Sequence, residues 1–153
     1  MPDPARPNNP TAGAIHERIQ ITNETKNLIV VREFMTKMVG LSRLRKEDEN
    51  KVILAVDEAI SNIIEHAFEE TRTGEIEIEV DADDARFAVT IRDSGKEFDP
   101  KKLDPGVNIL DHVKQGKRHG LGIFIMRQIM DEVNYIFKEG VQNELRLVKY
   151  ING

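Results

Sequence analysis

The residues best suited to chemistry begin with a polar stripe formed by Glu58, Asn62 and His66. Their four-residue spacing puts a carboxylate, an amide and an imidazole on one face of a helix, where they would line a groove. Ile60 lies about 200° around that helix from Glu58 and is expected to face the core. Charged residues are common on the outer face of an amphipathic helix, so the stripe alone is weak evidence of a site.

Two glycine-containing segments later in the chain add to this stripe. In the segment from Asp93 to Phe98, a carboxylate leaves a predicted strand, and Gly95 lets the backbone turn and approach a ligand closely. Gly120 and Gly122 stand just before a predicted helix, an arrangement that exposes backbone N–H groups to phosphate oxygens. Each segment also occurs as an ordinary turn, so it is their fixed order along the chain that indicates a site.

Composition restricts the class of protein. The 153 residues carry 22 Lys plus Arg against 27 Asp plus Glu, for a formal net charge of -5. The length fits one compact domain, and the negative charge argues against nucleic acid as a partner. The absence of Cys excludes disulfides, thiolate zinc sites and a thiol nucleophile, and favours the reducing cytoplasm. Apolar runs are far below the roughly 20 residues that cross a bilayer, so no membrane partner is expected.

Hydrophobic periodicity predicts the elements that must position these residues. Apolar spacing of three and four predicts helices over residues 24–39, 46–68 and 121–133. Alternation predicts strands over residues 15–21, 76–80, 87–91, 135–137 and 145–148, with the first at an edge and the others in two hairpins. This order predicts an α+β fold, a two-layer α/β sandwich in which helices cover one face of a mostly antiparallel mixed sheet.

The chain ends differ from this domain in composition. Residues 1–13 contain four of the six Pro and no apolar run, so they lack the hydrophobic segment of a secretion signal. We therefore predict a disordered tail over residues 1–14, followed by a single domain over residues 15–153.

Together the three segments resemble the N, G1 and G2 boxes of the Bergerat-fold ATPases, the superfamily of gyrase, MutL and sensor histidine kinases. The matching residues are Glu58, Asn62, Asp93, Gly95, Phe98, Gly120 and Gly122. The resemblance covers about residues 15–151. Within the superfamily, the run from Asp57 to Asn62, with His66-Ala67-Phe68 behind it, is most similar to the anti-sigma-factor serine kinases of bacterial partner-switching systems.

The resemblance implies that the chain binds ATP and Mg²⁺, with a role for each matched residue. Glu58 would be the general base, Asn62 would ligate Mg²⁺, and Asp93 would accept a hydrogen bond from the adenine amino group. Gly95 would let the purine lie close, and His66 would support the helix. The other residues implied to bind the nucleotide are Phe98, Arg118, Gly120, Leu121 and Gly122.

The segment from Asp99 to His119 is predicted to be a lid over the nucleotide. It shows no sustained period and is long for a connection in so small a domain. It also has a local basic excess in an acidic chain, which suits closure over a triphosphate. Its basic residues are Lys101, Lys102, Lys114, Lys117 and Arg118.

The closing strand departs from the family pattern. Family members commonly carry a small hydroxyl residue there, near the adenine, whereas this chain has the run from Asn143 to Leu147, with Glu144 and Arg146 inside it. Two explanations stay open: the water network around the base differs, or the strand is aligned wrongly.

The resemblance implies an ATP-dependent anti-sigma factor and serine/threonine protein kinase. It would phosphorylate a small anti-sigma-factor antagonist protein and alternatively sequester a sigma factor, and a second copy of the chain is a further candidate partner. The alternative is a nucleotide-dependent protein-binding module without phosphoryl transfer, which would have no need of Glu58 as a base. A detached histidine-kinase catalytic domain is less favoured, because 153 residues leave no room for a dimerisation helix pair.

Overall fold

The strands of the chain pair into one antiparallel sheet. The computed structural model describes residues 14–66, 74–93, 118–138 and 142–151, with the backbone alone at 66, 118–123, 137, 138 and 142. The described strands follow the spatial order β1-β2-β3-β5-β4, and each neighbouring pair is antiparallel. They are β1 (Ile15–Thr22), β2 (Glu75–Ala82), β3 (Arg86–Asp93), β4 (Glu132–Lys138) and β5 (Gln142–Tyr150). β1 lies at an edge, as the sequence predicts.

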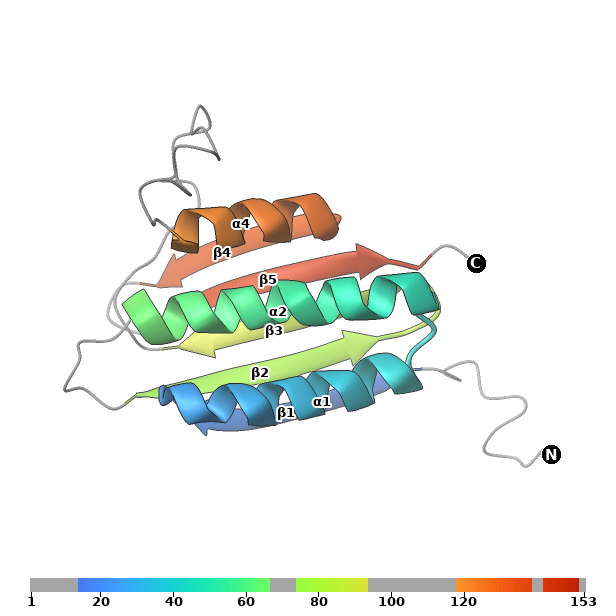
Figure 1. Cartoon of the computed structure of the whole chain (residues 1–153). Helices are drawn as coiled ribbons and strands as arrows, with labels where there is room; N and C mark the ends of the chain where they lie inside the picture. The colour runs from blue at the N-terminus through green and yellow to red at the C-terminus, as the bar shows by residue number, and fades with distance from the viewer. Residues whose placement is uncertain (1–13, 67–73, 94–117, 139–141, 152–153) are drawn as a thin grey trace.

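Helices cover one face of this sheet (Figure 1). The described helices are the 3-10 helix η1 (Thr25–Asn27) and the α-helices α1 (Leu28–Leu41), α2 (Lys46–His66) and α4 (Arg118–Ile129). α2 lies between α1 and α4 and packs against both (Figure 1). The predicted α+β class, with a two-layer arrangement and helices on one face, is confirmed.

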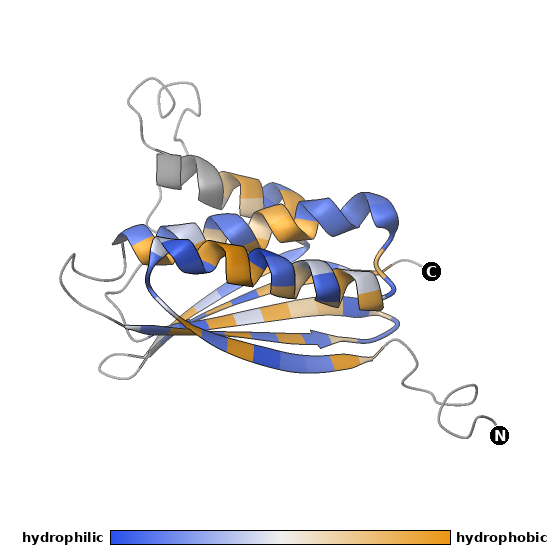
Figure 2. Ribbon diagram, turned by 60° about the horizontal axis from the view of Figure 1, so that its bottom comes forward, coloured by the Kyte–Doolittle hydropathy of each residue, from blue (hydrophilic) through white to orange (hydrophobic). Residues whose placement is uncertain are grey.

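Alternation along the strands decides which side chains meet the helices. In β2, Ile76, Ile78 and Val80 are fully buried, whereas the Glu residues between them point to the opposite face. In β3 the buried inward-facing positions run from Phe87 through Val89 and Ile91. Side chains alternate between faces along a strand, so this inward set continues to Asp93, the last residue of β3. Figure 2 shows hydrophobic and hydrophilic positions interspersed along the strands.

α1 differs from its predicted range of 24–39 at both ends. Its start is delayed because the Asn27 side chain donates hydrogen bonds to the carbonyl oxygen of Thr22, at 3.1 Å, and to its hydroxyl, at 2.7 Å. The chain turns there through η1. The helix continues past Gly40 and ends where Ser42 Oγ donates to the carbonyl oxygen of Val39 at 2.7 Å. Local side-chain bonds to the backbone therefore set both boundaries.

α4 lies earlier in the chain than predicted. The sequence predicts a helix over 121–133, but α4 ends at Ile129 and Val133 belongs to β4, opposite Leu147 of β5. The error has a geometric cause: a four-residue spacing places side chains on one face both in a helix and in a strand. The chain leaves the helix at Asp131, whose backbone N–H donates to the carbonyl oxygen of Val148 at 2.8 Å.

Several predicted features lie outside the described residues. They are the tail over residues 1–13, the positions Ala67 and Phe68, Gly95, Phe98, the lid from 99 to 117 and the turn at Gly140. Within the described part of the chain, no helix is both long enough and apolar enough to span a membrane.

Candidate functional site

Asp93 and Asn143 form a buried polar pair at one end of the sheet. They are directly opposite each other in the β3–β5 register, and their side chains are 6% and 2% exposed. Asn143 Nδ2 donates a hydrogen bond to Asp93 Oδ1 at 3.1 Å. Asn143 has the same strand parity as the buried Leu145 and Leu147, so both members of the pair lie on the helix side of the sheet.

Asn62 is buried on α2, although a polar residue on a helix is expected to face solvent. It is 3% exposed and follows Ala55 and Ala59, both buried, along one side of the helix. Among the residues that the structure describes, its Nδ2 atom has no hydrogen-bond partner. A buried N–H donor without a partner costs free energy, so a bound hydrogen-bond acceptor at this position would be stabilising.

Glu58 lies one turn before Asn62 on α2 and is half-buried. The four-residue spacing puts the two side chains on neighbouring turns of the same face, as the sequence predicts. The outer-face interpretation of the stripe does not hold for Asn62, because that side chain is enclosed. For His66, the last residue of α2, only the backbone is described.

The predicted phosphate-binding residues lie within the first five residues of α4. Arg118 is the first residue of the helix, so Gly120, Leu121 and Gly122 lie within its first turns. The sequence had placed the two glycines before the helix. The first four N–H groups of an α-helix have no partner within the helix. The Gly120 N–H is one of these groups, which bind phosphate oxygens at the N-termini of helices.

The topology brings these elements to the same end of the molecule. α2 ends, β3 ends, β5 begins and α4 begins at the left of Figure 1. Among the residues whose burial is described, the buried polar or charged side chains are Asn62, Thr90, Asp93 and Asn143. Three of these four therefore lie toward one end of the sheet, on or under the helix layer.

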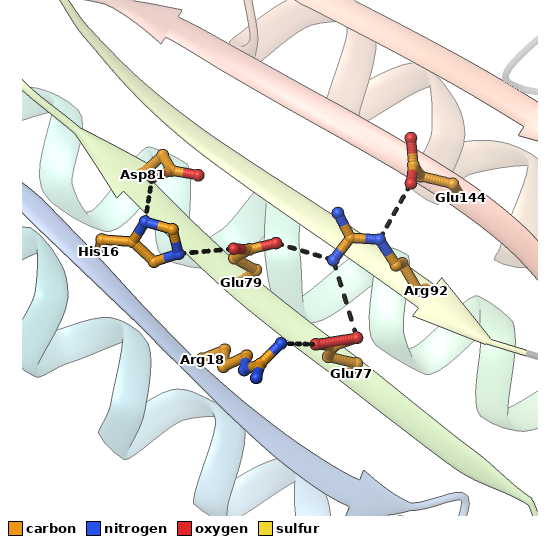
Figure 3. Close-up of polar contacts among 7 residues, drawn as sticks. All are labelled: His16, Arg18, Glu77, Glu79, Asp81, Arg92 and Glu144. Atoms are coloured by element: carbon orange, nitrogen blue, oxygen red, sulfur yellow. Dashed lines mark hydrogen bonds and ion pairs between the residues drawn. The ribbon is translucent and has the colours of Figure 1, made fainter.

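The opposite face of the sheet carries a network of charges (Figure 3). Arg92 is its centre and contacts three carboxylates: Glu79 at 2.8 Å, Glu144 at 3.0 Å and Glu77 at 3.7 Å. Arg18 adds a contact of 3.3 Å to Glu77. The hydrogen bond from Arg92 lowers the pKa of Glu79 below its ordinary value, although burial of that carboxyl group opposes the shift.

His16 extends this network toward the edge strand (Figure 3). Its Nε2 atom lies 2.7 Å from Glu79 Oε2, and its Nδ1 atom lies 3.1 Å from Asp81 Oδ1. Ligand atoms of these three residues lie within 4.8 Å of one another, close enough to hold a metal ion. The two carboxylates nevertheless contact opposite ring nitrogens, and Glu79 is already bonded to Arg92. The contacts of His16 therefore extend the polar network around Arg92.

The fold and the enclosed polar end together define an α+β protein of the Bergerat ATP-binding type. A family model described as the histidine kinase-like ATPase domain matches residues 21–149. The chain belongs to this histidine kinase-like ATPase family.

Relatives with this domain carry a kinase name. The chain is similar to the serine-protein kinase RsbW of Bacillus velezensis, with 29% identity over 138 residues that cover 88% of this chain and 85% of the relative. It is 36% identical over 103 residues to RsbW of Bacillus subtilis, covering 65% and 63% of the two chains. With RsbW of Listeria innocua it shares 33% identity over 102 residues, covering 65% and 64%. The matches thus span just under two thirds of the last two relatives.

Asn143 is the residue at this end that the sequence did not assign to the site. The sequence flagged the strand from Asn143 to Leu147 only because it lacks the expected hydroxyl residue. The register shows that this strand lies beside Asp93. The sequence did contain a signal for Asn143. It lies two residues before the inward-facing Leu145, and side chains two residues apart in a strand point to the same face.

Proposed function

We propose that this chain is an ATP-dependent serine/threonine protein kinase and anti-sigma factor. In this proposal it phosphorylates a small anti-sigma-factor antagonist protein in the cytoplasm and alternatively sequesters a sigma factor, thereby regulating transcription. Membership of the histidine kinase-like ATPase family and similarity to proteins named serine-protein kinase support it. The observation that carries it is the enclosed Asn62, one turn after Glu58 and at the same end as Asp93.

Asp93 is assigned to the adenine base. A carboxylate is an acceptor only, and adenine has an exocyclic amino group where guanine has an oxygen. Burial removes competing water from Asp93, so a mismatched base would leave a costly unpaired group. The phosphates are assigned to the beginning of α4, where Gly120, Gly122 and Arg118 lie.

The donor set at α2 fits Mg²⁺. This ion is hard, prefers oxygen ligands and is usually held by few protein groups together with phosphates and water. Asn62 supplies an amide oxygen for the ion, and its buried Nδ2 donor, which has no partner among the described residues, suits an acceptor such as a phosphate oxygen beside that ion. When bound, the ion would neutralise phosphate charge during transfer.

Glu58 is assigned as the base for the attacking hydroxyl. Its carboxylate accepts the proton as the hydroxyl oxygen of the substrate bonds to the γ-phosphorus and the bond to the β-phosphate oxygen breaks. A pure nucleotide-dependent binding module, the alternative function, would not need this base. The presence of Glu58 one turn from Asn62 therefore favours phosphoryl transfer.

Transfer of label from radioactive ATP tests this function directly. The full chain is incubated with Mg²⁺, γ-labelled ATP and the small protein encoded beside it, and label is expected on a Ser or Thr of that protein. Glu58→Gln should lower the rate by about 10²–10⁴-fold and leave nucleotide binding intact. Glu65→Gln, on the exposed side of the same helix, is the matched control. Binding of ATP with no label transferred under any condition would favour the binding-module alternative.

A further inference from the structure

We propose that Asn143 is a positioning residue that orients Asp93 for recognition of the adenine amino group. The inference rests on the nucleotide-binding function proposed above, and it assigns to this chain a specific device for base selection. It explains the place where the sequence departs from the hydroxyl residue of its family.

The geometry of the pair supports this role. Asp93 ends β3 and Asn143 is the second residue of β5, and the antiparallel register sets them directly opposite each other. Their backbones are fixed by ladders on both sides, since β3 also pairs with β2 and β5 also pairs with β4. The hydrogen bond from Asn143 Nδ2 to Asp93 Oδ1, at 3.1 Å, joins two side chains that are each more than nine-tenths buried.

The chemistry of the two side chains fixes the direction of the hydrogen bond between them. An ionised carboxylate can only accept hydrogen bonds, so the Asn143 side chain must present its NH₂ group and not its oxygen. A hydroxyl at this position could rotate its single hydrogen toward another acceptor. The amide is planar and its donor end is held by the carboxylate, so the plane of the Asp93 carboxyl group is constrained.

This constraint matters for base recognition. A hydrogen bond weakens steeply when its angle falls, so a carboxylate that turned freely would discriminate poorly between donors and acceptors on a purine. Held by Asn143, Asp93 would meet an amino group in a single orientation. Loss of Asn143 should therefore reduce the contribution of that amino group to binding and leave contacts with the rest of the nucleotide unchanged.

A pair of nucleotides separates this positioning role from a structural one. ATP and purine riboside triphosphate, which lacks the 6-amino group, are titrated calorimetrically with Mg²⁺ into the full-length chain. The wild type should prefer ATP. Asn143→Ala should weaken the binding of ATP by about tenfold and leave the binding of purine riboside triphosphate unchanged. The preference for ATP is then lost. Asn143→Thr, whose hydroxyl hydrogen can rotate away from Asp93, should recover only part of the preference.

Two further variants complete the test. Asn134→Ala, an exposed Asn on the neighbouring strand β4, is the matched control and should behave as the wild type. If thermal unfolding shows that Asn143→Ala is not folded, Asn143→Leu is measured instead; it keeps a similar volume, has no donor and should lose the preference.

The possible failures are distinguishable. An equal loss of affinity for both nucleotides in Asn143→Ala, or in Asn143→Leu, would overturn the positioning role and leave the proposed function standing. A wild-type chain that binds neither nucleotide would overturn the proposed function and this inference with it.

Discussion

Two faces of one sheet carry polar side chains, and the two sets are arranged in opposite ways. On the outer face, Arg92 and the carboxylates around it neutralise one another at separations of 2.8–3.7 Å while remaining partly exposed (Figure 3). On the helix face, Asn62, Asp93 and Asn143 are enclosed, and none of them is a cation. The charges of the first set pair with one another, whereas the second set is buried and includes the Asn62 Nδ2 atom, which has no partner within the described part of the chain.

The contrast separates charges that pair with one another from buried polar groups that a ligand could bind. The outer network holds most of the close ion pairs among β1, β2, β3 and β5, yet each charge already has its partner, so a ligand would have to displace one. Buried polar groups are expensive and are usually retained for a reason. The enclosed end is therefore the region where substitutions should change binding, and the outer face the region where they should change stability.

The largest effect is expected for Asn62→Ala. Loss of the amide oxygen should weaken Mg²⁺-dependent ATP binding by about a hundredfold or more, since loss of groups that only support a metal ligand already costs about 10–100-fold. Asn50→Ala, exposed on the first turns of the same helix, is the control. Calorimetric titration with and without Mg²⁺ measures both. If the ATP affinity of Asn62→Ala depends on Mg²⁺ as strongly as that of the wild type, Asn62 is not a ligand of the ion.

Asp93→Asn should have the next largest effect. The amide can turn its NH₂ group toward the base, so the preference for ATP over GTP should fall by about 10–100-fold, the value of a hydrogen bond to a charged group. Asp84→Asn, exposed in the turn between β2 and β3, is the control. Competition of GTP against a fluorescent ATP analogue gives the ratio. A variant that keeps the wild-type ratio would mean that the base is read elsewhere.

Arg92→Met should have a smaller effect, on stability alone. It leaves three neighbouring carboxylates without their shared cation and should lower the free energy of unfolding by about 1–2 kcal/mol. Arg18→Met should cost less, because the Arg18 side chain is 70% exposed. Urea unfolding measures both. If Arg92→Met is fully folded but binds ATP more weakly than the wild type, the outer face also affects binding, and the proposed separation between the two faces is wrong.

The smallest expected effect is a pH dependence from Glu79. Its folded-state pKa lies below the ordinary value of 4.5, chiefly because Arg92 donates to it. A lowered pKa stabilises the fold at pH values above about 4.5, and this contribution is lost as the pH falls through the folded-state pKa. Glu79→Gln should therefore lose less stability than the wild type between pH 6 and pH 3. Glu17→Gln, exposed on β1, should follow the wild-type curve.

The sequence predicted the elements well where one pattern dominated. The hairpin of β2 and β3 is correct because alternating apolar and charged residues cannot be accommodated as a buried helix stripe. The boundaries of α1 were missed because they depend on side-chain hydrogen bonds of Asn27 and Ser42. The end of α4 was missed because a spacing of four suits both helix and strand, which placed Val133 in the wrong element.

The candidate site was predictable only in part. Glu58, Asn62 and Asp93 were identified by the order of their motifs, and the structure carries them to one end of the sheet. The bond between Asn143 and Asp93 could not be predicted, because it joins residues 50 positions apart and depends on the register of β3 and β5. Periodicity assigns a residue to a face of a strand but does not assign its partner on the next strand.

Calorimetric titration of the wild-type chain with ATP and with GTP, in the presence of Mg²⁺, tests the central claim most directly. An adenine nucleotide site at the enclosed end predicts Mg²⁺-dependent ATP binding that is at least about tenfold tighter than GTP binding, because Asp93 accepts from an amino group that guanine lacks at that position. Equal affinity for ATP and GTP, or no binding of either, would contradict it.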